Sequence, residues 1–140
     1  MSTSTDLSAP TTTGMKVARV GALAAVGSVI AVEIVAVIGK ALGAPEVSAL
    51  TAAPLAVFTV VGVAVATVAW VLLGRRPNGG QLLRVLVPIV LVVSFVPDLL
   101  LGVGGTAWSS VATLIVAHTA VFLVTIPVFV RLLSPSRLTR

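Results

Sequence analysis

Four long apolar stretches, separated by short polar segments, dominate the pattern of hydrophobic and polar positions along the chain. They cover residues 17–42, 54–74, 85–102 and 107–130. A helix needs ~20 apolar residues to cross the hydrocarbon layer of a bilayer, and each stretch is close to that length or longer. The segments between them, GAPEVSALTAA, RRPNGGQ and GVGGT, are rich in residues that break helices and form turns. The pattern predicts an all-α protein, a four-helix transmembrane bundle with up-down topology.

The two ends of the chain lack this pattern. Residues 1–14, MSTSTDLSAPTTTG, are rich in Ser and Thr and show no apolar periodicity, so they are predicted to be a disordered tail. Residues 15–133 form the predicted transmembrane domain, and residues 134–140 a short basic tail.

Composition supports this interpretation and excludes several kinds of protein. Of the 140 residues, 58% are hydrophobic and 9% are charged, whereas a soluble domain carries about 25% charged residues. The chain has no cysteine and one histidine, which excludes disulfides, thiolate chemistry and multi-histidine metal sites. We therefore expect no metal and no cofactor. The net charge of +5 comes from basic residues at the ends of the apolar stretches rather than from one basic face, so no nucleic-acid partner is expected.

The positions of the basic residues predict an orientation. Alternation of the spans puts all but Lys40 on the same side of the membrane, and cytoplasmic loops are enriched in Lys and Arg. Both termini are therefore predicted to be cytoplasmic. Three of these residues, in and after the loop RRPNGGQ, are candidates for contact with lipid head groups. The residues on the predicted cytoplasmic side are Lys16, Arg19, the head-group candidates Arg75, Arg76 and Arg84, and Arg131, Arg137 and Arg140.

Three ionisable residues lie inside the apolar stretches: Glu33, Asp98 and His118. Each is thirteen or fourteen residues from a basic residue at the cytoplasmic end of its span. At ~1.5 Å per residue, all three lie roughly 20 Å from that boundary. Charged groups at this depth cost about 2.5–3.5 kcal/mol and tend to pair, so we expect a Glu33–Asp98–His118 cluster inside the bundle. Ser94, one helical turn before Asp98, is expected on the same face.

Other positions have structural explanations. Trp70 and Trp108 fall near opposite ends of their spans, as aromatic residues at the two membrane interfaces do. Small residues recur four apart at Gly62 and Ala66, and also along Ser109, Thr113 and Ala117, with Ala120 beside them. Both stripes predict close contacts between helices.

These features leave three functions open. The cluster can hold helices together in a structural or partner-binding membrane subunit, whose partner is another membrane protein or a second copy of the chain. It can instead handle protons and ligand in a proton-coupled carrier of a small or hydrophobic ligand. As a third alternative, an acid and a histidine at one depth can perform acid–base chemistry on a lipid, although no residue is assigned as catalytic.

The stretch SFVPDLLLG, followed by AHTAVFLVTIPVFVRLL, resembles a family of small actinobacterial four-helix membrane proteins catalogued as a domain of unknown function. Its most recognisable residues are Ser94, Pro97 and His118, followed by Pro127 and Arg131. The resemblance covers about residues 15–133. It implies a four-span protein of the bacterial cell membrane and no particular activity. The abundance of Ala, Val and Gly and the excess of Arg over Lys agree with a bacterial source.

Overall fold

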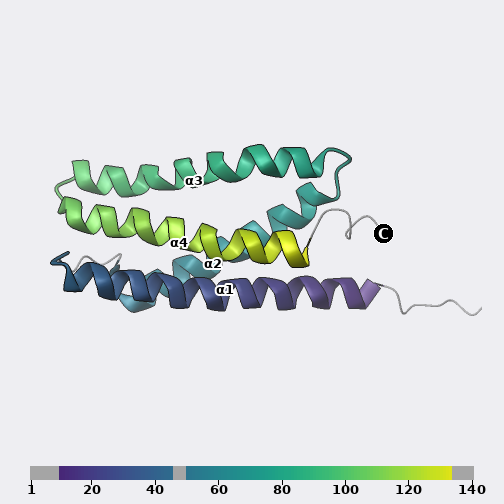
Figure 1. Ribbon diagram of the computed structural model, residues 1–140, viewed down its shortest axis with the longest axis horizontal. Coiled ribbons are helices and arrows are strands. Elements are labelled where there is room, and N and C mark those ends of the chain that lie inside the picture. Colours follow the sequence, from purple (N-terminus) through teal and green to yellow (C-terminus); the bar gives the residue numbers. More distant parts are fainter. Residues whose placement is uncertain (1–9, 46–49, 134–140) are drawn as a thin grey trace, which may run out of the picture.

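The computed structural model of the protein describes residues 10–45 and 50–133, which contain four helices and no strand. The helices are α1 (Pro10–Ala41), α2 (Ala52–Gly74), α3 (Gly79–Val103) and α4 (Trp108–Leu132). All four are long and apolar enough to cross a membrane, in α1 from Gly14 onward. Consecutive helices run in opposite directions (Figure 1). The predicted all-α, up-down bundle of four membrane-spanning helices is confirmed.

Three helices begin earlier than the apolar pattern predicts, and α2 does so by only two residues, at Ala52. α1 begins at Pro10, so residues 10–14 are helical although they were assigned to the disordered tail. A proline fits the first turn of a helix, where its missing N–H costs nothing. α3 begins at Gly79 rather than near Val85, because Gln81, Leu82 and the residues after them favour a helix even where they leave the apolar layer. Residues 1–9 and 134–140, the rest of the predicted tails, lie outside the described residues.

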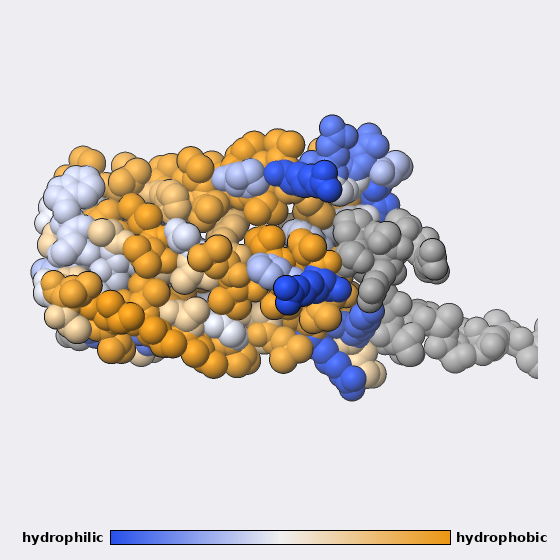
Figure 2. Space-filling model, viewed as in Figure 1, coloured by the Kyte–Doolittle hydropathy of each residue, from blue (hydrophilic) through white to orange (hydrophobic). Residues whose placement is uncertain are grey.

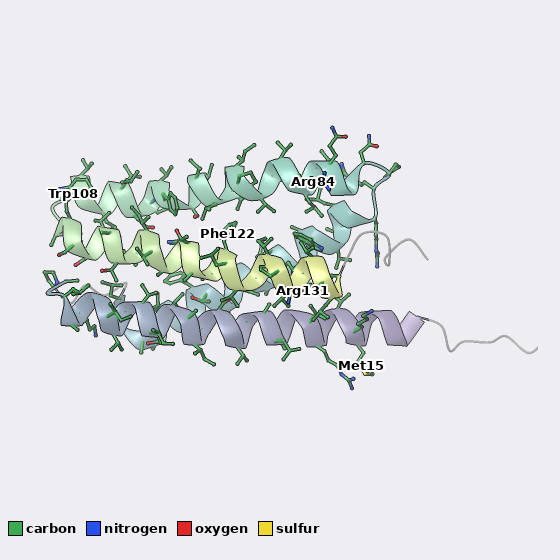
Figure 3. All side chains as sticks on the ribbon, viewed as in Figure 1. Met15, Arg84, Trp108, Phe122 and Arg131 are labelled. Atoms are coloured by element: carbon green, nitrogen blue, oxygen red, sulfur yellow. The ribbon has the colours of Figure 1, made fainter. Side chains whose placement is uncertain are left out.

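Basic residues lie together at one end of the bundle. Figure 3 shows Arg84 and Arg131 at the same end as Met15, with Trp108 at the opposite end. Figure 2 shows the most hydrophilic surface at the first of these ends, beside an extensive apolar surface along the helices. This arrangement is the one that the charge pattern requires, and the assignment of that end to the cytoplasm stays a prediction.

The buried core forms two clusters that involve the helices differently. The cluster near the basic end receives residues from all four helices, whereas the cluster near the opposite end receives none from α3. At that opposite end α3 is held against α4, where Gly102 lies beside Trp108 and Val111. The space between α2 and α3 is therefore not closed by a common core at that end. The first cluster consists of Val20, Ala24, Val63, Trp70, Leu83, Phe129 and Leu133, and the second of Val32, Ala36, Leu50, Leu55, Leu114 and Ala117.

Trp70 is part of the core rather than an interface anchor. Its side chain is only 6% exposed, its ring packs against Phe129 at a centroid distance of 5.4 Å, and its Nε1–H donates to the Leu133 carbonyl at 2.9 Å. That bond satisfies a carbonyl at the end of α4, where the helix itself supplies no partner. Trp108, by contrast, is exposed, as expected of an aromatic residue at the membrane interface.

Small residues bring α1 and α4 close together. The hydroxyls of Ser28 and Thr125 share a hydrogen bond of 3.0 Å. A side chain at Gly39 would overlap Thr113, and Ala117 belongs to the second core cluster. The predicted close contact along the Thr113 and Ala117 stripe is confirmed, because both residues pack against α1.

Candidate functional site

A cavity of about 550 Å³ lies within the membrane-spanning part of the bundle. Its walls come mainly from α2, α3 and α4, and Val32 is the single lining residue from α1. Ligand pockets in proteins are typically 300–1,000 Å³ and mostly apolar, with a few polar groups that orient the ligand. The lining residues are Val32, Leu55, Phe58, Thr59, Gly62, Val63, Ala66, Val90, Ser94, Pro97, Asp98, Leu114, Ala117, His118, Val121, Phe122, Thr125 and Ile126.

The cavity opens sideways between α2 and α3. Phe58 and Gly62 of α2 and Val90 and Pro97 of α3 line it and are exposed. Phe58, for example, is 74% exposed. Because these residues lie in the middle of membrane-spanning helices, the opening faces the lipid tails.

Gly62 has a role in the cavity that differs from the predicted one. It was expected, with Ala66, to form a close contact between helices. The position that its Cβ would occupy has no neighbour within 4 Å, so Gly62 leaves open space at the cavity wall. The prediction of a close helix contact at Gly62 is wrong, because α2 diverges from α3 there.

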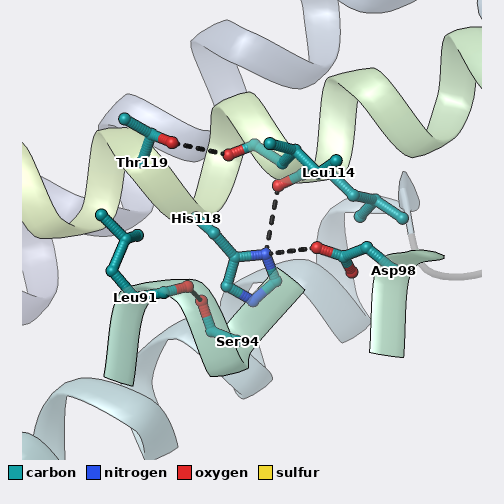
Figure 4. A network of polar contacts seen from close by, with 7 residues as sticks. Leu91, Ser94, Asp98, Leu114, His118 and Thr119 are labelled. Carbon is teal, nitrogen blue, oxygen red and sulfur yellow. Dashed lines mark hydrogen bonds and ion pairs between the residues drawn. The ribbon is translucent and has the colours of Figure 1, made fainter. Parts of the chain in front are cut away.

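Asp98 of α3 and His118 of α4 form an ion pair at the cavity wall (Figure 4). The distance between Asp98 Oδ2 and His118 Nδ1 is 2.9 Å. Asp98 is 4% exposed, while the His118 side chain is 39% exposed. The same Nδ1 lies 3.1 Å from the Leu114 carbonyl, one turn earlier on α4.

The hydrogen-bond geometry leaves one oxygen of the Asp98 carboxylate without a donor. With its proton on Nδ1, His118 donates to the Leu114 carbonyl, and the N–H does not point at Asp98. Asp98 Oδ2 is buried and receives no hydrogen bond from the described residues, although it lies within ion-pair distance of the ring. A buried carboxylate oxygen without a donor is uncommon and indicates a missing partner.

Ser94 lies where the sequence predicts, on the same wall as Asp98, but it does not contact the carboxylate. Its hydroxyl donates to the Leu91 carbonyl of its own helix at 2.7 Å (Figure 4). This type of bond competes with the helical backbone pattern and leaves only oxygen lone pairs on the cavity side.

Glu33 does not join the pair. It is half-buried on α1, it does not line the cavity, and it makes no hydrogen bond or ion pair with another described residue. Val32 faces the cavity instead, and the next residue of an α-helix points about 100° away from it. The structure therefore brings together two of the three residues expected in the cluster.

The remaining candidates lie apart from the cavity. Arg75 and Arg76 are exposed at the turn between α2 and α3, and Arg84 is exposed near the start of α3, all at the basic end of the bundle. Their contact with lipid head groups stays a prediction. Within the part of the chain that the structure describes, no three His, Asp or Glu side chains are grouped so that they could hold a metal ion.

These features define a four-helix membrane protein with a laterally open cavity and a buried carboxylate–imidazole pair. The chain belongs to the family of unknown function DUF6069, which matches residues 12–135. The match agrees with the resemblance noted from the sequence. Comparison with the curated proteins and with the solved structures gave no significant match.

Proposed function

We propose that the protein binds a hydrophobic ligand, which enters the cavity sideways from the bilayer and is oriented by Asp98 and His118. The observation that supports this proposal most directly is a cavity of about 550 Å³ beside an ion pair whose carboxylate, Asp98, is buried. The walls are apolar side chains such as Leu55, Phe58 and Val63, which suit a hydrocarbon body. In this proposal the protein lies in the bacterial cell membrane and takes its ligand from the lipid phase.

A structural role for the ion pair is the alternative, since the pair joins α3 to α4. Polar residues that only hold helices together are normally surrounded by close packing, because protein interiors have few voids larger than a water molecule. The open space beside Asp98 and His118 is what favours ligand binding over this alternative.

Photolabelling in lipid nanodiscs tests the proposal. The probe is a long-chain alcohol with a diazirine in its chain, which forms a covalent bond to nearby residues on illumination. We expect labels on peptides of α2 and α3 that line the cavity, around residues 55–66 and 90–98.

A variant that fills the cavity provides the decisive test. Gly62→Phe introduces a ring into open space and also removes a glycine from a helix interior, which favours folding by up to about 1 kcal/mol. We expect labelling of the cavity peptides to fall about tenfold, the effect of losing about 1.4 kcal/mol of binding. Gly80→Phe is the matched control, because Gly80 is also unhindered but does not line the cavity. Labels spread evenly over the outer faces of the helices, and unchanged by Gly62→Phe, would refute the proposal.

A further inference from the structure

The polar groups of the cavity wall indicate which chemical class of ligand it accepts. Two hydroxyl hydrogens on the wall are already used by the protein itself. Thr59 donates to the Leu55 carbonyl at 2.7 Å, and Ser94 donates to the Leu91 carbonyl. These residues therefore present oxygen lone pairs, which are acceptors, to a ligand.

The ionisable groups of the cavity wall, Asp98 and His118, also offer hydrogen-bond acceptors to a ligand. Asp98 is the carboxylate of the cavity wall, and no lysine or arginine is among the lining residues. Its Oδ2 is buried and lacks a donor. With Nδ1–H directed at the Leu114 carbonyl, the neutral ring of His118 offers Nε2 as one more acceptor.

We infer that the ligand is a lipophilic amine, whose protonated ammonium group binds the Asp98 carboxylate while its hydrocarbon chain fills the apolar part of the cavity. Beside the neutral His118 ring, an ammonium group supplies both a positive charge for the carboxylate and N–H donors. Hydrogen bonds between charged partners are roughly twice as strong as those between neutral ones. An anionic lipid or a fatty acid, in contrast, would bring a second negative charge beside Asp98. The inference rests on the proposed function and names the ligand class for the same cavity.

His118 is the group that competes with a ligand for this carboxylate. Its ring lies 2.9 Å from Asp98, so an ammonium group that binds Asp98 replaces the ring as the ion-pair partner. Other elements supply no further competitor from the cavity lining, because α1 contributes only Val32 to it and α2 contributes no ionisable residue. Glu33 lies outside the lining.

Three photolabelling probes with the same diazirine-bearing chain test the inference. They end in a primary amine, an alcohol and a carboxylate, and they are compared in nanodiscs of zwitterionic lipid. For the wild-type protein we expect the amine to label the cavity peptides about tenfold or more above the alcohol, and the carboxylate to label them least. In Asp98→Asn, which keeps the shape of the side chain, the ratio of amine to alcohol should fall to about one.

The outcomes separate the two proposals. If amine and alcohol label the cavity equally in the wild-type protein, and Gly62→Phe blocks both, the amine inference is refuted while ligand binding stands. If Gly62→Phe blocks neither probe, the proposed function itself fails, and the inference fails with it.

Discussion

Replacing His118 by phenylalanine tests the energetic link between α3 and α4. The substitution keeps a planar ring at the helix contact and removes both ring nitrogens, so Asp98 loses its ion-pair partner at 2.9 Å. Removing one partner of a buried ion pair typically costs 3–5 kcal/mol. Because the His118 side chain is 39% exposed, part of its charge is solvated, and we expect a loss near or below the lower end, about 2–3 kcal/mol in the free energy of unfolding.

Protonation of the orphaned carboxyl sets an upper limit on this loss. An aspartic acid in water has a pKa of about 3.9, and each pH unit is worth about 1.36 kcal/mol, so neutralising it costs about 4 kcal/mol at pH 7. The double variant Asp98→Leu with His118→Phe should be within about 1 kcal/mol of the wild type, because no charge is then left buried.

Unfolding in mixed micelles titrated with sodium dodecyl sulfate measures these changes through tryptophan fluorescence. Trp70 lies in the core and Trp108 lies against α3 at Gly102, so the two tryptophans report on both ends of the bundle. Leu123→Phe on the exposed face of α4 is the control and should change stability by less than about 0.5 kcal/mol. If His118→Phe costs less than about 1 kcal/mol at pH 7, or if the double variant costs the sum of the two single ones, the two residues are not coupled.

Three further predictions use the same unfolding assay. Trp70→Phe should lower stability by about 1–2 kcal/mol, because the Leu133 carbonyl loses its donor, and an unchanged midpoint would show that this bond is not needed. Gly39→Ala should lower the free energy of unfolding by about 1–3 kcal/mol, because its Cβ would overlap Thr113, whose Oγ1 lies 2.5 Å from that position. Adding Thr113→Ala should restore most of this stability. A loss that persists in the double variant would show that the strain lies elsewhere. Glu33→Leu should raise stability by about 2–3 kcal/mol, because Glu33 has no ion-pair or hydrogen-bond partner on a membrane-spanning helix, whereas a loss would reveal a partner.

The number and type of elements could be predicted from the sequence because a bilayer imposes few solutions. Each backbone polar group must be satisfied within its own helix, so an apolar stretch of sufficient length specifies a spanning helix. Helix ends are less well determined. Between the apolar layer and water, residues such as Gln81 and Arg84 continue a helix without adding hydrophobicity, and α3 therefore begins before its apolar stretch.

The shared level of Asp98 and His118 along the bundle could also be predicted, since their side chains are 2.9 Å apart, but the direction of Glu33 around its helix could not. Counting from the basic residues places Glu33, Asp98 and His118 at a common depth. A rotation of one residue, about 100°, decides whether a side chain faces the bundle. That rotation is determined by the small residues through which α1 packs on α4, such as Ser28 and Gly39, and it directs Val32 rather than Glu33 to the cavity.

The cavity itself depends on tertiary geometry that no local pattern contains. The turn from α2 to α3 is tight at Gly79, where a Cβ would collide with the backbone of Leu73 and Gly74, so the two helices are close at that end. At the other end the core cluster contains residues of α1, α2 and α4 and lacks α3. Because α2 and α3 diverge from this tight turn, a space opens beside Asp98. The sequence shows that position 62 is a glycine, but not that the space beside this glycine is open.

α3 is the helix least fixed by apolar packing, so the Asp98–His118 ion pair both lines the cavity and helps to hold α3 against α4. Its fully buried residues are Gly79 and Leu83 near one end and Asp98 and Gly102 near the other. Between these two attachments lies the cavity wall, and Pro88 within that segment removes a backbone hydrogen bond, as Pro97 does beside Asp98. Because the second attachment includes the Asp98–His118 contact, an ammonium group that takes the carboxylate also weakens the link between α3 and α4. Ligand binding at Asp98 and the contact between α3 and α4 are in that case linked, because both use the same carboxylate.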